Sequence, residues 1–327
     1  MDYKVSVIIP VYKVERFIGR CVRSLMEQTL DEVEFLFVDD ATPDGSMQVL
    51  AETLAGYPAR QSAVRVLHHE RNLGLPAARN TGLAAARGEY VFHCDSDDYV
   101  SPEALAGMYE AAAAHGADMV WCDWFLTFAQ NERRMKQPAL DMAWEALKAM
   151  LCGTMRYNVW NKLVRRELYV RHGIVFPAGY GMGEDMTMIR LAAFARKVAY
   201  VPHAYYHYVK LNAGAFSQTY SEAHLQELRH NVDGTVRFIT ARYGHALDAE
   251  LAFFKLEVKM PFLITARSDK FRLWQSWYPE ANAYITRNIH VSWRRRMVQW
   301  CAAHGWWWPV RLHYWVVVKA MYGMIYR

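Results

Sequence analysis

Acidic side chains gather at two places in the first hundred residues, and each group directly follows an apolar run. Asp39 and Asp40 follow EFLFV, whereas Asp95, Asp97 and Asp98 follow YVFHC. Carboxylates this close repel one another unless a cation or hydrogen-bond donors compensate their charge. Oxygen ligands of this kind suit Mg²⁺ or Mn²⁺, which often keep waters and substrate phosphates in their coordination shell. The two groups therefore predict a divalent metal site, with the capping of a turn or helix as the alternative for any single acid.

The elements that must position these acids predict an α/β fold. From residue 5 to residue 124, short apolar runs alternate with helical patterns. The predicted strands span 5–10, 34–40, 64–69, 89–95 and 118–124, and the predicted helices span 15–29, 44–57, 74–88 and 101–116. Such alternation is typical of a mostly parallel sheet with helices on both faces. Because ligands bind outside the carboxyl ends of the strands in these sheets, both acidic groups should share one edge.

The second half of the chain is less regular. Ser101 is the expected N-cap, and Pro102 the expected first residue, of the last helix in the first half. Residues 160–173 predict another helix, 176–197 a glycine-rich loop that leads into a helix, and 198–208 a strand. Beyond these segments the pattern predicts helices only.

Composition argues against several classes of protein. The chain has 327 residues, of which 53% are hydrophobic and 22% charged, a globular rather than disordered composition. It holds no uncharged apolar stretch of the ~20 residues that a transmembrane helix needs. The opening MDYKVSVIIPVYK predicts a strand rather than a signal peptide. Five scattered cysteines without a C-x-x-C pair argue against a disulfide framework or a zinc site and favour a reducing cytoplasm.

Seven motifs occur in a fixed order along the chain: VSVIIPVYKVERFIGRCVRSLMEQTL, EFLFVDDATPDGS, NLGLPAARNTGLAAARGEYV, DSDD, VWNKLVRREL, GEDMTM and YYHY. Together they resemble the family 2 glycosyltransferases over residues 4–220. The resemblance implies the GT-A fold, a Rossmann-like fold of nucleotide-diphospho-sugar transferases, with Mn²⁺ or Mg²⁺ as cofactor. Two departures are small. Ala-Thr-Pro-Asp follows the first acidic pair where the family more often has Gly-Ser-Thr-Asp, and His93-Cys94 precede the DxD where apolar residues are commoner.

The first acidic group and the end of the first strand would bind the nucleotide, if the resemblance is carried over by position. Asp40 resembles the residue that recognises the base, and Asp39 beside it would help to hold the base or ribose. Pro10, Val11 and Tyr12 would form the floor under the nucleotide. The implied donor is a nucleoside-diphosphate sugar, with a UDP-sugar as the first expectation.

The second acidic group resembles the family's DxD motif. Asp95 and Asp97 would hold the ribose and a divalent metal that bridges the donor diphosphate. Asp98 is either a further metal ligand or the cap of the next helix. Arg79 resembles a family position near the donor, and a solvated helix arginine is the alternative.

Sugar transfer also needs a group that takes the proton from the attacking hydroxyl. Asp185 lies in Gly-Glu-Asp at the start of a predicted helix, and it resembles the catalytic base of inverting members, with Glu184 as its neighbour. The alternative is that the two acids only complement the helix dipole.

Glu184 and five further residues are candidate contacts to the acceptor or the diphosphate. The resemblance places Trp160, Asn161 and Lys162 in this region, and a buried structural Trp with a capping Asn is the alternative. His207 and Lys210 precede or flank the stretch LNAGAFS, which we expect to close over the diphosphate when the donor binds.

The end of the chain is basic and rich in tryptophan. Residues 281–327 hold seven Lys or Arg, half of the twelve Trp and no Asp or Glu, in a chain of net charge +5. Trp293, Met297, Trp300 and Cys301 share a predicted helical face. Basic helices rich in Trp often lie at the surface of anionic membranes. Packing on the catalytic domain, or on a second subunit to form an oligomer, is the alternative, and no motif supports binding to nucleic acid.

The sequence therefore predicts an inverting, metal-dependent glycosyltransferase. Residues 1–220 would form the catalytic domain, with a nucleotide-sugar half at 1–124 and an acceptor and base half at 125–220, and residues 221–327 a helical extension. The expected acceptor is a glycan or lipid-linked molecule of bacterial surface polysaccharide synthesis, at the inner face of the plasma membrane. The alternative is a nucleotide-sugar-binding regulator or partner without transferase activity. A dinucleotide-dependent oxidoreductase is not supported, because Pro-Val-Tyr-Lys stands where G-x-G-x-x-G would follow the first strand.

Overall fold

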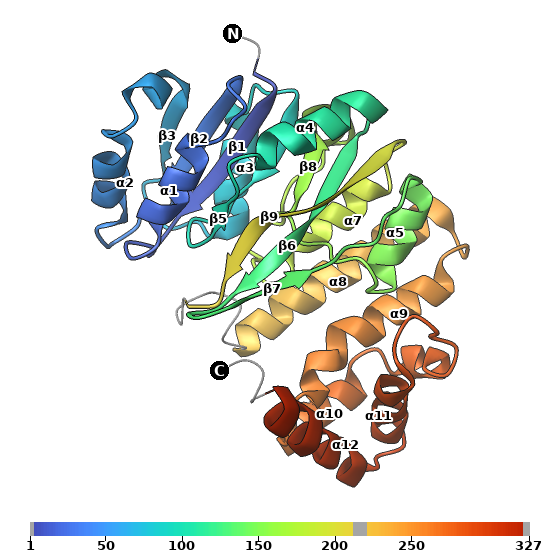
Figure 1. Ribbon diagram of the computed structural model, residues 1–327. Coiled ribbons are helices and arrows are strands. Elements are labelled where there is room, and N and C mark those ends of the chain that lie inside the picture. The colour runs from blue at the N-terminus through green and yellow to red at the C-terminus, as the bar shows by residue number, and fades with distance from the viewer. Residues whose placement is uncertain (1–2, 212–220, 323–327) are drawn as a thin grey trace. The chain divides into compact units, whose positions relative to one another are not determined.

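The computed structural model describes residues 3–211 and 221–322, and its contacts divide into two compact units (Figure 1). The first unit comprises residues 1–146 and 157–235, and the second comprises 147–156 and 236–327. The boundary predicted at residue 220 stays a prediction, since compact groups of contacts need not be independent folding domains.

A mixed sheet forms the centre of the first unit. In the described residues its nine strands run in the order β3-β2-β1-β4-β8-β6-β9-β5, and β7 pairs with β6. The strands are β1 Val5–Val11, β2 Val33–Asp39, β3 Val64–His68, β4 Tyr90–His93, β5 Tyr99–Val100, β6 Met119–Thr127, β7 Glu132–Met135, β8 Lys162–Arg165 and β9 Val198–Val209.

The first four strands in this order are parallel, as the alternation of the sequence predicts. Val11 at the end of β1 lies opposite Asp39 at the end of β2, which in turn lies opposite His68 at the end of β3. The buried pattern is continuous along β1 and nearly so along β2, as expected for strands covered on both faces. The carboxyl ends of these strands are therefore level at one edge.

The other half of the sheet is where the sequence-based prediction of elements was partly wrong. The helix expected at 160–173 begins only at Arg166, because Lys162–Arg165 form β8. Leu163 lies opposite Phe92 of β4 on one side and Val120 of β6 on the other. Hydrogen bonding to two neighbouring strands outweighs the local helical pattern, as tertiary context often does.

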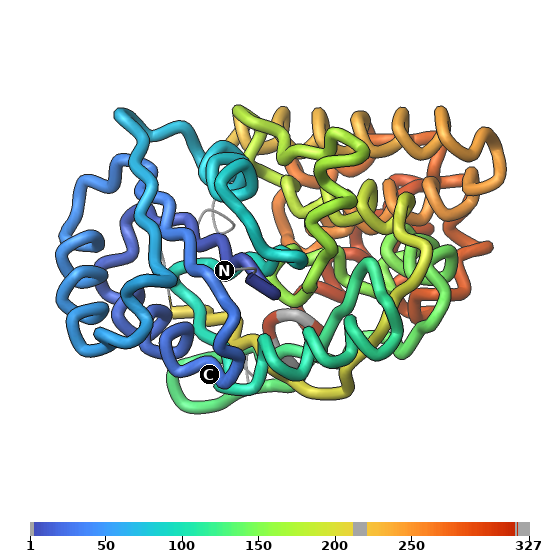
Figure 2. The backbone as a smooth tube through the Cα atoms, turned by 90° about the horizontal axis from the view of Figure 1, so that it is seen from above, coloured from blue at the N-terminus to red at the C-terminus, as the bar shows by residue number. Residues whose placement is uncertain are grey.

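Helices cover both faces of the sheet, which confirms the predicted α/β architecture; Figure 2 shows α3 and α4 on opposite sides of it. The helices of the first half are α1 Ile18–Met26, α2 Ser46–Leu54, α3 Leu75–Ala85 and α4 Ala104–His115, and those after β7 are α5 Ala143–Leu151, α6 Arg166–His172 and α7 Thr187–Ala192. The predicted N-cap of α4 was wrong. Ser101 instead donates its N–H to Tyr205 O of β9 at 2.8 Å, so α4 begins three residues later.

The second unit consists of helices, as predicted for the described part of this segment. They are the end of α8 Glu222–Tyr243, then α9 Asp248–Lys259, α10 Ser268–Ser276, α11 Trp293–Ala303 and α12 Trp307–His313, with a π-helical continuation at Tyr314–Tyr322. Lys259 is buried among them and donates to Trp277 O and Asn282 Oδ1 at 2.8 and 2.7 Å. Burial lowers the pKa of Lys259 to about 7. Within residues 3–211 and 221–322, no helix has the length and apolar character to cross a membrane.

A buried network fixes the crossover into β4, the strand that leads to the second acidic group. Ser6 Oγ donates to Glu34 Oε1 at 2.6 Å, and the N–H groups of Arg87 and Gly88 donate to Glu34 Oε1 and Ser6 Oγ at 2.6 and 2.8 Å. A Cβ at Gly88 would lie 2.5 Å from the backbone N of Ser6 and 2.7 Å from the carbonyl carbon of Val5. No side chain fits there without movement of β1.

We therefore expect Gly88→Ala to lower the free energy of unfolding by about 1–3 kcal/mol, because backbone atoms cannot yield as a side chain can. Gly19→Ala is the matched control: Gly19 lies inside α1, and its Cβ would come no nearer than 3.4 Å to Val49. That variant should be neutral or up to about 1 kcal/mol more stable. Urea unfolding measures both, and equal stabilities would contradict the close approach.

Candidate active site

The end of β1 ties the two acidic groups together. Pro10 O accepts a hydrogen bond from Ser96 Oγ at 2.6 Å, and Val11 O accepts one from the backbone N–H of Asp40 at 3.1 Å. Val11 is fully buried, whereas Tyr12, the next residue, is 38% exposed. The predicted floor of a nucleotide site therefore lies between the two groups, with Tyr12 as its exposed part.

Asp40 is buried and holds a loop. Its Oδ1 accepts from Leu73 N at 2.8 Å and from His69 Nδ1 at 2.7 Å, while its Oδ2 accepts from Gly74 N at 2.9 Å. His69 Nε2 lies 2.8 Å from Thr81 Oγ1, on the helix α3 that follows this loop. Asp40 thus fixes the path of residues 69–74 into α3.

Asp39 is the more open member of the first pair. Its Oδ1 accepts from Thr42 N at 2.9 Å, and its Oδ2 lies 3.1 Å from Nδ1 of the exposed His68. The carboxylate of Asp39 therefore lies at the carboxyl end of β2 and is less buried than that of Asp40.

The second acidic group divides into inner and outer carboxylates. Asp98 is fully buried, and its oxygens accept from the Tyr206 hydroxyl at 2.8 Å and from Val209 N at 2.7 Å. Burial raises the pKa of Asp98 well above its ordinary value, and the charges of Asp97 and Asp95 raise it further. Asp95 and Asp97 are partly exposed. Asp98 thus anchors β9 and does not cap the next helix, which was one of its two predicted roles.

Arg79 lies between the donor acids and the segment of the predicted base. It is 1% exposed, its Nε donates to both carboxylate oxygens of Glu184 at 2.8 and 3.0 Å, and its Nη2 donates to Asp95 Oδ1 at 2.8 Å. The alternative of a solvated helix arginine is therefore wrong. Burial by itself would lower the pKa of Arg79, but Glu184, Asp95 and Asp185 outweigh burial and raise it. Burial raises the pKa of Glu184, and its ion pair with Arg79 opposes this rise.

The inner side of the Arg79 guanidinium is lined by an aromatic and uncharged environment. The guanidinium lies 5.8 Å from the ring of Phe176, which the His93 ring meets edge-on at 5.1 Å. Arg79 Nη1, both ring nitrogens of His93 and the Tyr169 hydroxyl have no hydrogen-bond partner among the described residues. Burial, and then the charge of Arg79, lowers the pKa of His93 well below its ordinary value, so its ring is neutral at pH 7. The positive charge of Arg79 is therefore compensated only on the side that faces Glu184 and Asp95.

Asp185 has one oxygen held and one open. Val159 N donates to its Oδ1 at 3.0 Å, and Oδ2 has no hydrogen-bond partner among the described residues. The side chain is partly exposed. Burial raises its pKa above the ordinary value; Arg79 lowers it and Asp95 raises it. A carboxylate with a raised pKa and a free oxygen is suited to accept a proton near neutral pH.

Three of the predicted acceptor or diphosphate contacts are buried, and their roles stay predictions. Trp160 stacks on Tyr206 at 4.4 Å and is 5% exposed. Asn161 donates its side-chain N–H to Cys122 O at 2.9 Å, and Lys162 Nζ donates to Asn161 Oδ1 at 2.9 Å. Burial lowers the pKa of Lys162 to about 7. The contacts of these residues hold β8 and the residues before it against β6 and β9. Trp160 is therefore a buried Trp, as the alternative expected, but Asn161 caps no helix.

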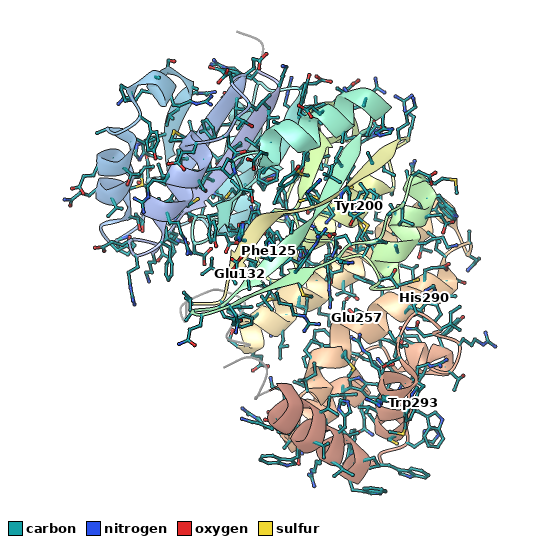
Figure 3. All side chains as sticks on the ribbon, in the orientation of Figure 1. Phe125, Glu132, Tyr200, Glu257, His290 and Trp293 are labelled. Carbon is teal, nitrogen blue, oxygen red and sulfur yellow. The ribbon has the colours of Figure 1, made fainter. Side chains whose placement is uncertain are left out.

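His207 and Lys210 have different surroundings. His207 Nδ1 lies 2.8 Å from Glu132 Oε1, and its ring stacks between Tyr99 and Phe125 at 4.2 and 5.0 Å; Figure 3 labels Phe125 and Glu132 on the paired strands β6 and β7. Lys210 Nζ lies over the Tyr208 ring at 4.6 Å. Burial lowers the pKa of Lys210, and the negative charges of Asp98 and Asp97 oppose this effect. Residues 212–217 of the expected closing loop lie outside the described residues.

Sequence reasoning missed two residues that complete the site. The Tyr206 hydroxyl accepts from Asp95 N at 3.0 Å and donates to Asp98, so one phenol fixes both ends of the turn at residues 95–98. Its signal was the aromatic alternation of the strand now seen as β9. Val159 acts through its backbone N–H, for which no side-chain signal exists.

The second acidic group fits a divalent metal without forming a closed cage. Among the described residues, no three His, Cys, Asp or Glu side chains converge as a ready set of ligands. Mg²⁺ and Mn²⁺ are commonly held by only one or two carboxylates, with substrate phosphates completing the shell. Asp95 and Asp97 are carboxylates of this kind, because they are partly exposed and crowded by like charge.

Comparison with known proteins agrees with this geometry. Residues 6–176 match the family described as Glycosyl transferase family 2. The chain belongs to this family. It is 35% identical to the uncharacterised glycosyltransferase EpsJ of Bacillus subtilis over 58% of its own length, and spans 56% of EpsJ. It is 30% identical to the cholesterol galactosyltransferase of Borreliella burgdorferi over 83% of its length, and spans 77% of that relative.

Solved structures of similar fold confirm the GT-A architecture of this family 2 chain. Residues 1–349 of S. aureus TarS, in complex with UDP-GlcNAc, align with a TM-score of 0.71 at 21% identity, over 98% of this chain and 92% of that one. The mannosyltransferase PcManGT of Pyrobaculum calidifontis, in complex with GDP-Man and Mn²⁺, aligns with a TM-score of 0.53 at 16% identity, over 96% and 88%. At these identities the likeness concerns the fold alone.

The buried ion pair of Arg79 with Glu184 predicts strong coupling. Arg79→Met should lower the free energy of unfolding by about 3–5 kcal/mol, because it leaves Glu184 buried without its partner. The double variant Arg79→Met, Glu184→Leu removes both charges and should be much less destabilised than the sum of the single variants. A double-mutant cycle by urea unfolding measures this coupling, and additive effects would contradict the ion pair.

Proposed function

We propose that this chain is an inverting, metal-dependent glycosyltransferase that moves a sugar from a nucleoside-diphosphate donor, a UDP-sugar first, to a glycan or lipid-linked acceptor. The observation that carries the proposal is Asp185. Its carboxylate has a raised pKa and one free oxygen, and Arg79 joins the neighbouring Glu184 to Asp95 of the DxD turn.

The donor end of the proposed site consists of Asp39, Asp95 and Asp97 around the end of β1. Asp39 would bind the ribose or base, above the exposed ring of Tyr12. Asp95 and Asp97 would hold a divalent metal against the diphosphate. When bound, this ion acts as a Lewis acid that neutralises the charge of the leaving diphosphate. Arg79 holds Asp95 in place and supplies a fixed positive charge beside it.

The base end performs the proton transfer. The acceptor oxygen forms a bond to the anomeric carbon while the bond from that carbon to the diphosphate oxygen breaks, and the nucleoside diphosphate leaves with the electron pair. The hydroxyl proton passes to Asp185 Oδ2, while Val159 N–H holds Oδ1. A single base on the face opposite the leaving group gives inversion, since no second carboxylate has to form a covalent intermediate.

The acceptor class is supported by the relatives. The Borreliella relative is named a cholesterol galactosyltransferase. Another relative, 36% identical over 36% of this chain, is the poly(ribitol-phosphate) beta-glucosyltransferase of Bacillus spizizenii. We propose accordingly that the acceptor is a lipid-linked or growing surface polysaccharide, met at the inner face of the plasma membrane.

Asp185→Asn should reduce sugar transfer about 10²–10⁴-fold, because the amide cannot accept the proton. Donor binding, measured by calorimetry, should stay unchanged. Glu167→Gln is the matched control, since Glu167 is an exposed acid of α6 and should keep full activity. If the wild-type chain binds the donor but transfers sugar to no glycan or lipid-linked acceptor, the alternative of a nucleotide-sugar-binding partner would be supported.

Metal dependence is checked by stability as well as activity. With Mn²⁺ and a UDP-sugar at ~100 times its Kd, the chain should gain about 2.7 kcal/mol of stability, seen as a rise in Tm. EDTA should abolish most of this rise, and Asp97→Asn should reduce it, whereas Asp31→Asn, at an exposed side chain, should leave it unchanged. A Tm rise that is the same with EDTA would contradict a metal at Asp97.

A further inference from the structure

Helix α11 exposes its apolar stripe instead of burying it. Trp293, Met297 and Trp300 follow one another at i, i+4 and i+7, and they are 62%, 44% and 37% exposed. This spacing places them on one face of the helix. The opposite face packs into the second unit through Val298 and Ala302, which are fully buried. Cys301, which the sequence grouped with the tryptophans, belongs to the buried face.

The following helix repeats the arrangement. Trp308 and Leu312 are 72% and 55% exposed on α12, and Trp315 and Val316 continue the stripe in the π-helical turn at 58% and 49%. The inward face of α12 is already satisfied, because Trp307 stacks on Phe271 of α10 at 4.7 Å.

Trp306, which lies between the two helices in the chain, extends the stripe of α11. It is 53% exposed, and its ring meets that of Trp300 at 5.2 Å. Figure 3 labels Trp293 on α11, at the start of this surface. We call the exposed side chains of residues 293–316 the tryptophan face. Single exposed apolar residues are ordinary, whereas a continuous run of them marks an interaction surface.

The charged side chains of the segment that carries the tryptophan face are all basic. Arg294 and Arg311 are exposed on its two helices, and Lys319 is exposed beyond them. Arg295 is compensated, because it pairs with Glu257 of α9 at 2.5 Å. Residues 281–327 contain no Asp or Glu. The face therefore combines interfacial tryptophans with uncompensated positive charge, which is complementary to anionic lipid headgroups.

We propose that the tryptophan face binds the surface of an anionic bilayer, with its indole rings at the headgroup level and its basic side chains on the lipid phosphates. This deepens and rests on the proposed function, because a lipid-linked acceptor is reached from the membrane surface. A second copy of the chain fits the face less well. A symmetric pairing would bring Arg294 and Arg311 of one copy against the same charges of the other, without an acid from this segment.

The test is cosedimentation of the full-length chain with vesicles, in the absence of donor and acceptor. One set of vesicles is pure phosphatidylcholine, and the other also contains about 30% phosphatidylglycerol, an anionic lipid that gives the surface a negative potential. The chain should bind the anionic vesicles at least tenfold more strongly. High salt should weaken this binding, because salt screens the charges. Equal binding to the two kinds of vesicle, or no binding to the anionic ones, would overturn the proposal.

Variants locate the binding to this face. Trp293→Ser with Trp308→Ser should lower the partition coefficient roughly tenfold or more, since apolar area leaves the interface. Arg294→Gln should lower it about fivefold. The matched control is Val170→Ser with Val175→Ser, two apolar residues of the first unit that are 67% and 58% exposed, and it should bind as the wild type does.

Two further measurements separate the outcomes. If size-exclusion chromatography shows a dimer that the tryptophan double variant converts to a monomer, the face is a contact between copies, and the membrane proposal is overturned. Hydrolysis of the donor or transfer to a water-soluble acceptor should be the same in the double variant and the wild type. A chain that binds vesicles but has no transferase activity would refute the proposed function and leave the membrane face standing.

Discussion

The buried guanidinium of Arg79 is the interaction on which the site depends. A charge with 1% exposure is tolerated only when it is paired and hydrogen bonded. Its partners come from distant parts of the chain, Asp95 at the end of β4 and Glu184 before α7. The pairing therefore links the segment of the proposed base, Asp185, to the second acidic group. On its other side, neutral aromatic groups keep the positive charge directed at the carboxylates.

The acids of the site fall into a buried group and a partly exposed group. Asp98 and Asp40 are buried, and each has its oxygens satisfied by donors of the protein itself, chiefly backbone N–H groups. They hold β9 and the loop into α3. Asp95, Asp97 and Asp39 stay partly exposed. Like charges in one turn repel, so the inner acids hold the backbone of the site, whereas the outer ones are the carboxylates that we propose for a cation and a substrate.

The two compact units differ in what they leave exposed. In the first unit both acidic groups lie at strand ends, where parallel strands finish level with one another. In the second unit, α11 and α12 bury one apolar face among their neighbours and present a second one outward. A helix that is apolar on both faces usually needs a partner for the second face. The basic side chains beside Trp293 and Trp308 indicate the chemistry of that partner.

The sequence by itself determined the parallel strands with their helices, the two acidic groups and the candidate base, because apolar periodicity and local motifs carry that information. It also located the tryptophans of the last helices. Tertiary structure decided the rest. Residues 162–165 are a strand because two neighbouring strands hold them, and Trp160 is buried because Tyr206 stacks on it. The pairing of Arg79 with Glu184 joins residues 105 positions apart. Local sequence patterns cannot encode such contacts, because the contacts form only when segments that are distant in the chain pack together.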